Sequence, residues 1–173
     1  MRLRHLAAAP CVVLAATLSV PAAASAANAS PVPWQPYRTS PWTDAPGSVC
    51  TFGVATTIVT DQEQYRTLAS YPDGSPKVQE FRGPLAVRYT NTSTNESVVR
   101  DLSGYAWFRY GADGGTGAFI ASHIGLTVPV GNAGFPPGEW VITGQSVVTI
   151  ASSGTINVQL LHATAENLCR TLS

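Results

Sequence analysis

The segment from Glu139 to Cys169 constrains the fold more than any other part of the chain. It contains two runs rich in β-branched residues, and the loop Ser152-Ser153-Gly154 separates them. A glycine at the end of a three-residue loop can adopt the left-handed backbone conformation that closes a β-hairpin. The segment therefore predicts a long antiparallel hairpin and, with it, an all-β fold class.

The spacing of the apolar residues predicts the register of this hairpin. A loop that pairs Ala151 with Thr155 gives, counting outward, the pairs Ile150–Ile156, Val148–Val158, Ser146–Leu160 and Gly144–His162. One face of the hairpin is then mostly apolar as far as Ile142 and Trp140, and the other face is mostly polar. A slip of one residue would mix the two faces, so we expect this register along the whole hairpin.

The rest of the chain from Cys50 onward alternates strand-like runs with turns that contain glycine and proline. We expect strands over the ranges Cys50–Thr60, Glu63–Tyr71, Lys77–Arg82, Leu85–Asn91, Ser97–Tyr110 and Ala118–Val130, with a short helix as the alternative for Glu63–Tyr71. Helical periodicity is almost absent between these runs. Such a succession predicts an antiparallel sheet that closes or folds on itself.

Two features favour an antiparallel β-barrel over the alternative, a β-sandwich. Gly83, Gly104 and Gly125 lie within or between long strand-like runs, where glycine lets a strand bend at a barrel corner. Cys50 begins the first strand and Cys169 follows the last, so a disulfide between them would bring these strands together as neighbours. Two strands on facing sheets of a sandwich would also satisfy the disulfide.

The N-terminus resembles a secretory signal peptide. Basic residues in Met1–Arg4 precede the apolar run Leu6–Val20, and Ala24-Ser25-Ala26 matches a small-x-small cleavage site. We expect cleavage after Ala26 and an extracellular location. The predicted organisation is a signal peptide over 1–26, an N-terminal arm over 27–49 and a single β domain over 50–173.

The charge and the cysteine content of the chain exclude some classes of function. Without Arg2 and Arg4 the chain keeps 8 of its 10 basic residues against 10 acidic ones, a net charge of roughly −2. A basic patch typical of nucleic-acid binding is absent from the sequence, and a second long apolar run that could span a membrane is absent too. Cys50 and Cys169 are the cysteines outside the signal peptide, and we expect them to form one disulfide.

The arm over 27–49 is rich in proline, which blocks helices and central strands. It also carries the aromatic residues Trp34, Tyr37 and Trp42. These side chains could fix the arm to the surface of the domain, or the arm could be a mobile tether. The sequence leaves both alternatives open.

A ligand pocket is the candidate site that follows from the predicted register. His162 would lie on the apolar face opposite Gly144, where the missing side chain leaves space beside the imidazole. The residues proposed to line this pocket are His162, Trp140, Ser146, Gly144, Tyr105 and Trp107. The alternative is a core histidine that hydrogen-bonds to the backbone, and His123 is interpreted as an edge or surface residue.

No set of catalytic residues follows from the sequence. Gly144-Gln145-Ser146-Val147-Val148 lacks the second glycine of a nucleophile elbow. Asp73 and Asp113 lie in turns, where aspartate caps the backbone. Neither cysteine outside the signal peptide has a histidine or second cysteine at metal-ligand spacing, so we expect no metal and no cofactor.

The chain resembles a group of small secreted actinobacterial proteins to which no activity is assigned. The resemblance covers most of the chain from Cys50 onward, over the segments Tyr71–Pro76, Glu80–Pro84, Asp101–Tyr105, Ile124–Val128 and Glu166–Cys169. It implies secretion and supplies no activity. Gly114–Phe119 is similar to a short motif of dirigent and allene oxide cyclase barrels. This similarity favours a calycin-like or allene-oxide-cyclase-like barrel.

We therefore expect a secreted, non-enzymatic protein that binds a small apolar ligand or a partner at the cell surface. One alternative is an enzyme that works in a cavity, such as a cyclase or isomerase. Another is a module that binds cell-wall polysaccharide through Trp34, Tyr37 and Trp42.

Overall fold

A computed structural model describes residues 32–173 of the chain, except residues 114, 130–134 and 152. The predicted signal peptide over 1–26 and the beginning of the predicted arm lie outside the described residues. Within the described part the secondary structure is almost entirely β, as predicted. No helix in these ranges is long and apolar enough to cross a membrane.

The strands follow the predicted ranges closely, with one division that the sequence analysis did not expect. They are β1 (Gln35–Pro36), β2 (Thr43–Asp44), β3 (Val54–Asp61), β4 (Gln64–Ser70), β5 (Pro76–Gly83), β6 (Leu85–Asn91), β7 (Ser97–Asp101), β8 (Gly104–Tyr110), β9 (Thr116–Val128), β10 (Gly138–Ile150) and β11 (Ile156–Asn167). One short helix, α1 (Leu168–Thr171), follows the last strand. The predicted strand Ser97–Tyr110 is two strands, β7 and β8, which belong to different sheets.

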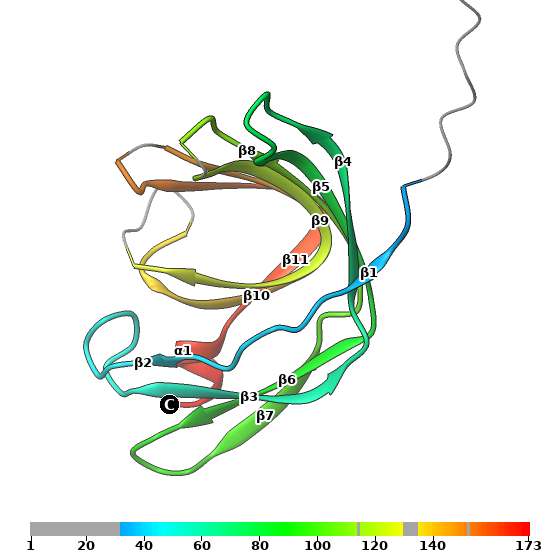
Figure 1. Ribbon diagram of the computed structural model, residues 1–173. Coiled ribbons are helices and arrows are strands. Elements are labelled where there is room, and N and C mark those ends of the chain that lie inside the picture. The colour runs from blue at the N-terminus through cyan, green and yellow to red at the C-terminus, as the bar shows by residue number, and fades with distance from the viewer. Residues whose placement is uncertain (1–31, 114, 130–134, 152) are drawn as a thin grey trace, which may run out of the picture. The chain divides into compact units, whose positions relative to one another are not determined.

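The strands form two antiparallel sheets, and neither is closed into a barrel in the part of the chain that the structure describes. The larger sheet has seven strands in the order β1-β4-β5-β8-β9-β10-β11, and the smaller has four in the order β2-β3-β6-β7 (Figure 1). The predicted barrel is therefore wrong. Cys50 precedes β3 in the smaller sheet and Cys169 follows β11 in the larger one, so the two cysteines do not mark a seam between neighbouring strands. Two sheets are consistent with the sandwich alternative.

The chain passes from one sheet to the other at three adjacent crossings, which we call the corner: residues 62–63, residue 84 and residues 102–103. Backbone hydrogen bonds join the crossings, because Gln62 N donates to Pro84 O at 2.9 Å and Leu102 N donates to Leu85 O at 2.8 Å. Gly83 has φ +136° at this point, and a Cβ there would meet the carbonyl oxygen of Gln62 at 2.6 Å. Gly83 thus lies at a bend, as predicted, but the bend connects two sheets.

The hairpin of β10 and β11 confirms the predicted register near its loop and contradicts it farther away. Ala151 N donates to Thr155 O at 3.0 Å, and Ser146 pairs with Leu160. Beyond that pair the register shifts by one residue, so Gly144 pairs with Ala163 rather than with His162. Leu161 is the extra residue of a β-bulge, and a bulge moves every later side chain of its strand to the opposite face.

Buried apolar side chains form two clusters. The first, which we call the sealed core, joins the smaller sheet to β10 and α1 and contains Val49, Cys50, Phe52, Val54, Leu85, Val87, Tyr89, Leu102, Val141, Leu168 and Leu172. The second belongs mainly to β9, β10 and β11 and contains Phe119, Ala121, Leu126, Val128, Phe135, Ile142, Val148 and Ile156. Strand β10 contributes Val141 to the first cluster and Ile142 to the second, so its first half is buried on both faces.

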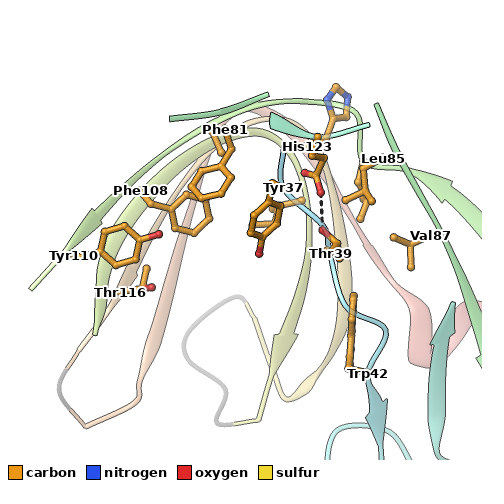
Figure 2. A pocket seen from close by; sticks show the side chains of 15 residues that line it. Tyr37, Thr39, Trp42, Phe81, Leu85, Val87, Phe108, Tyr110, Thr116 and His123 are labelled. Carbon is orange, nitrogen blue, oxygen red and sulfur yellow. Dashed lines mark hydrogen bonds between the residues drawn. The ribbon is translucent and has the colours of Figure 1, made fainter. Parts of the chain in front are cut away.

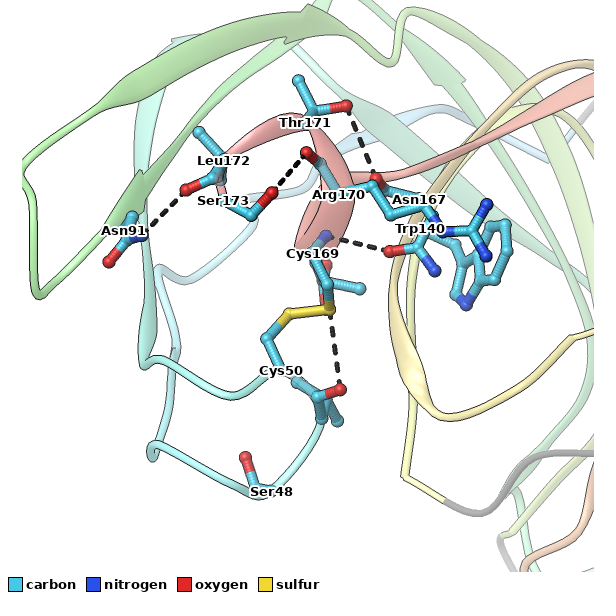
Figure 3. The surroundings of a disulfide bond; sticks show 12 residues. Ser48, Cys50, Asn91, Trp140, Asn167, Cys169, Arg170, Thr171, Leu172 and Ser173 are labelled. Carbon is cyan, nitrogen blue, oxygen red and sulfur yellow. Dashed lines mark hydrogen bonds between the residues drawn. A yellow bond between two sulfur atoms is a disulfide. The ribbon is translucent and has the colours of Figure 1, made fainter.

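The predicted disulfide between Cys50 and Cys169 is present at the edge of the sealed core, with the two Cα atoms 5.3 Å apart (Figure 3). The same region holds the C-terminal residues in place. Asn91 Nδ2 donates to the carbonyl oxygen of Leu172 at 2.8 Å, and Cys169 N donates to Asn167 Oδ1 at 2.9 Å. The disulfide therefore links the start of the smaller sheet to the end of the larger one.

The described part of the N-terminal arm is fixed to both sheets. β1 pairs with β4 in the larger sheet, and β2 pairs with β3 in the smaller sheet. Between them, Trp42 N donates to Thr56 Oγ1 at 2.7 Å and Thr56 N donates to Trp42 O at 2.9 Å. From residue 32 onward the arm thus packs on the domain, and the alternative of a mobile tether does not apply to these residues.

Candidate functional site

A cavity of about 380 Å³ lies on the inner side of the corner (Figure 2). It is lined by Tyr37, Thr39, Trp42, Glu63, Phe81, Leu85, Val87, Leu102, Ala106, Phe108, Tyr110, Thr116, His123, Ile124 and Gly125. The passages of the chain between the sheets border the cavity: Thr39 lies in the arm, Glu63 and Leu102 lie in the corner, and Leu85 begins β6 directly after residue 84. The cavity is therefore a consequence of the way in which the two sheets are connected.

Aromatic side chains form much of the cavity wall. The ring of Tyr37 meets that of Phe81 edge-on at 5.1 Å between centroids, and Phe81 meets Phe108 at the same distance. Phe108 stacks on Tyr110 at 6.3 Å. In β8, the residues Ala106, Phe108 and Tyr110 face inward because the side chains of a strand alternate between its two faces.

Two acidic residues at the first crossing hold the arm in place. Thr39 Oγ1 donates to Glu63 Oε2 at 2.6 Å, and Thr39 N donates to Asp61 Oδ2 at 2.8 Å. Asp61 Oδ1 also accepts a hydrogen bond from the backbone N–H of Glu63 at 3.0 Å. Arg38 Nη1 lies 3.8 Å from Asp61 Oδ1. Glu63 is thus placed at the cavity by the backbone of the corner and by the arm together.

The environment of the cavity shifts the pKa of three of its groups. Burial raises the pKa of Glu63, the hydrogen bond from Thr39 opposes this rise, and the charge of Asp61 adds to it. Burial raises the pKa of Tyr37, and the nearby charges of Glu63 and Asp61 raise it further. Burial also raises the pKa of Tyr110, whose hydroxyl donates to Gln79 Oε1 at 2.9 Å. The polar end of the cavity therefore lies beside two acidic side chains, Glu63 and Asp61.

A second, smaller cavity of about 40 Å³ adjoins the first and shares Glu63 and His123 with it. Arg82, Gly104 and Tyr105 complete its lining together with apolar residues. His123 Nδ1 is buried and has no hydrogen-bond partner among the described residues. A Cβ at Gly104 would lie 3.3 Å from this nitrogen, so the glycine allows β8 to approach His123 closely.

The structure does not bring the predicted pocket residues together. His162 is exposed on β11, Ser146 is fully buried, and Trp140 is partly buried against Phe135. Of the residues proposed to line the pocket, Tyr105 contacts the smaller cavity, and none lines the larger one.

The bulge at Leu161 explains why the predicted arrangement is absent. It turns His162 away from the face that carries Ala163, which packs against the second cluster. Tyr105 and Trp107 alternate with the inward residues of β8, and each is 44% exposed on the opposite face. The predicted roles of these residues in ligand binding remain predictions, and the cavity lies elsewhere.

The aromatic residues of the arm divide between two environments. Tyr37 and Trp42 line the larger cavity. Trp34 lies outside that lining, where the guanidinium carbons of Arg82 and Arg66 are 3.9 Å and 4.5 Å from the centroid of its ring. Sequence reasoning identified these aromatic residues as important but did not connect them with a cavity.

None of the residues that line the larger cavity was assigned to a pocket from the sequence, and the charged or titratable Glu63 and His123 are among those that were missed or interpreted differently. The available signal for Glu63 was the pair of acidic residues Asp61 and Glu63 at the end of a strand-like run. His123 was interpreted as a surface or edge residue, whereas it faces the space between the sheets. The described residues contain no group of three or more His, Cys, Asp or Glu side chains arranged to hold a metal ion.

Comparison of the chain with protein-family models, with curated proteins and with solved structures finds no match. The geometry of the corner and of the cavity inside it is therefore the basis for a functional hypothesis.

Proposed function

We propose that this protein is a secreted binding protein that holds a small, largely apolar ligand in the cavity at the corner of a two-sheet, sandwich-type fold. The single observation that carries the proposal is the cavity of about 380 Å³, which has aromatic walls and a few polar groups at one end. Ligand pockets of proteins are typically concave and mostly apolar, with volumes of roughly 300–1,000 Å³ and a small number of polar groups.

The construction of the site supports this proposal. The cavity is lined by residues of both sheets and of the arm. The hydrogen bonds of Thr39 to Glu63 and Asp61 fix the arm as one of its walls. A wall that is already ordered reduces the conformational entropy that the protein would lose when a ligand binds.

A neutral fluorescent probe tests the proposal. N-phenyl-1-naphthylamine is expected to bind the protein with enhanced fluorescence, and Ala106→Leu is expected to weaken binding by about tenfold or more because the larger side chain fills the cavity. Ala69→Leu, on the exposed end of β4, is the matched control and should bind as the unaltered protein does. Circular dichroism would show that both variants fold. Equal affinities of the folded Ala106→Leu and Ala69→Leu variants would contradict the proposal.

The alternative of an enzyme working in the cavity has weaker support. Acid–base chemistry would require two titratable groups that act on the same ligand. Glu63 and His123 both face the cavity, but no hydrogen bond joins them in the described part of the chain. A binding function needs no such pair.

A different observation favours the alternative of a surface partner. Tyr105 and Trp107 are exposed on the outer face of β8, with ring centroids 5.9 Å apart. Exposed aromatic rings on a flat sheet can stack on sugar rings, so insoluble cell-wall polysaccharide is the expected partner. Trp107→Ala should reduce co-sedimentation with this material, and Ala106→Leu should not. Unchanged co-sedimentation of Trp107→Ala would contradict this candidate.

A further inference from the structure

The charges at the cavity are unbalanced. Among the described residues that line the larger cavity, Glu63 is the only acidic side chain, and no lysine or arginine accompanies it. The other acidic residue at this crossing, Asp61, lies close enough to raise the pKa of both Glu63 and Tyr37. A negative charge in such a place is unfavourable for an anionic ligand and favourable for a cationic one.

Glu63 also differs from the other carboxylates near it, because no basic side chain in the described ranges pairs with it. Asp61 lies near Arg38, and Glu80 pairs with Arg66 at 2.6 Å. The one hydrogen bond of the Glu63 side chain comes from the neutral hydroxyl of Thr39. A partly buried carboxylate without a cation can still accept a charged hydrogen bond from a ligand.

The basic groups closest to Glu63 do not pair with it. Arg82 lines the smaller cavity, but its guanidinium stacks on Trp34 at 3.9 Å and donates to Gln64 Oε1 at 3.4 Å. His123 lines both cavities together with Glu63, and no hydrogen bond joins the two side chains in the described ranges.

The walls of the cavity complement a cation as well. Aromatic rings attract positive charge to their faces, and the effect increases when water is excluded. Tyr37, Trp42 and Phe81 contribute three such rings to the lining that also includes Glu63. Farther in, Phe108 and Ile124 provide an apolar surface for the rest of a ligand.

We propose that the cavity selects a hydrophobic organic cation, an ammonium with an aryl or alkyl body. This inference rests on the ligand-binding function proposed above and names the chemical class of the ligand. The ammonium donates a hydrogen bond to the free Glu63 oxygen and lies against the ring of Tyr37, and the apolar body packs against Phe81 and Phe108.

The preference of the cavity for a cation is expected to weaken as the pH falls. As the pH falls, protonation of Glu63 removes its negative charge, and this weakens the binding of a cation. His123 is the other titratable side chain that lines both cavities, and Asp61, Arg38 and Arg82 are the charged groups nearby. The binding of a neutral ligand depends little on any of them.

Three probes of the same shape test the inference with the folded, disulfide-bonded protein. They are 4-phenylbutylamine, 4-phenylbutanol and 4-phenylbutanoate, each measured by isothermal titration calorimetry at neutral pH. The amine is expected to bind about tenfold more tightly than the alcohol, and the carboxylate about tenfold more weakly. Glu63→Gln should lower the affinity for the amine to that for the alcohol. The matched control Glu80→Gln alters a carboxylate that already pairs with Arg66 and should preserve the preference.

The outcomes separate the inference from the function on which it rests. If the amine and the alcohol bind equally well to the unaltered protein, or if the carboxylate binds best, the inference is overturned and the binding function stands. If neither the three probes nor N-phenyl-1-naphthylamine binds to the protein, the proposed function itself is contradicted. The pH dependence of the unaltered protein provides a test without any variant, because loss of amine binding at acidic pH is expected while alcohol binding persists.

Discussion

Two glutamates in this molecule occupy buried positions with opposite surroundings. Glu63 lies at the corner beside a cavity of about 380 Å³, whereas Glu139 lies in β10 at the sealed core, with a side chain that is 0% exposed. Burial is the main cause of a raised pKa in both. The two residues therefore share an electrostatic property but differ in whether any molecule can reach them.

The side chain of Glu139 is completely buried by the described residues. Thr127 Oγ1 donates to Glu139 Oε2 at 2.7 Å, and Oε1 has no hydrogen-bond partner among the described residues. Burial raises the pKa of Glu139 to about 7, with a further contribution from Asp44. The hydroxyl of Tyr89 is also buried without a described partner, and the charge of Glu139 is one of the causes that raise its pKa.

The difference shows that a perturbed pKa does not by itself identify a ligand site. Glu139 has the larger pKa shift, yet neither cavity is lined by it. Glu63 combines a raised pKa with adjacent open space and aromatic walls. Leu85, Val87 and Leu102 belong to the sealed core and also line the cavity, so the two regions share a boundary. We assign a binding role to the corner and its cavity and a structural role to the rest of the sealed core, and each assignment predicts a different response to mutation.

The largest expected effect concerns the disulfide of the sealed core. Replacing Cys50 and Cys169 together by serine opens a loop with a sequence separation of 119 residues. Chain entropy predicts a loss of about 4–5 kcal/mol in the free energy of unfolding. Chemical denaturation measures this loss. Under conditions where the variant remains folded, its affinity for N-phenyl-1-naphthylamine should be unchanged, and a large loss of affinity would show that the two regions are not independent.

The next effect concerns the pH dependence of stability. The pKa of Glu139 rises from 4.5 to about 7 on folding, so the folded state binds more protons than the unfolded state between these values. Its contribution to stability is fully present below pH 4.5 and is lost as the pH rises to about 7. The loss amounts to about 3 kcal/mol for such a shift.

Glu139→Gln removes this titration and should flatten the stability profile over that pH range. Denaturation midpoints measured at several pH values provide the test, with Glu80→Gln, which alters a carboxylate paired with Arg66, as the control. Glu63→Gln should change the profile in the same direction but less, because Glu63 is only partly buried. A stability profile that Glu139→Gln leaves unchanged would contradict the account of the sealed core.

A smaller effect is expected for Tyr89→Phe. The Tyr89 hydroxyl is buried without a described partner, and removing an unpartnered buried polar group is nearly neutral or stabilising. The free energy of unfolding should therefore change by less than about 1 kcal/mol, or increase. A loss of about 2 kcal/mol or more in urea denaturation would reveal a hydrogen bond that the hydroxyl makes in solution.

Much of the fold could be predicted from the sequence, because hairpin loops and strand-like runs are local signals. The register of β10 and β11 from Ile150 to Ser146 follows from the position of Gly154 and from apolar alternation. The bulge at Leu161 had one signal in the sequence, because Gly144 next to the shift is an isolated glycine inside a strand-like run and has φ +102°. This glycine was interpreted from the sequence as space beside His162. One unpredicted residue was enough to move His162 to the surface.

The candidate site was harder to predict because it is a product of tertiary structure. Pro84 looks like an ordinary interruption between two strands, and Leu102–Ser103 lies inside a single predicted strand, yet at each of them the chain changes sheets. Glu63 and His123 come from crossings and strands that are far apart in the sequence. Their proximity depends on which strands share a sheet, and apolar periodicity does not contain that information.

The most direct test of the central claim is the mapping of a bound probe by NMR. Backbone amide shifts are recorded during titration with N-phenyl-1-naphthylamine. The account predicts that the largest shifts occur at Thr39, Glu63, Leu85 and Leu102, and that Glu139 and Val141 are little affected. Shifts concentrated around Glu139, or around Trp107 on the outer face, would contradict the claim that the corner is the binding site.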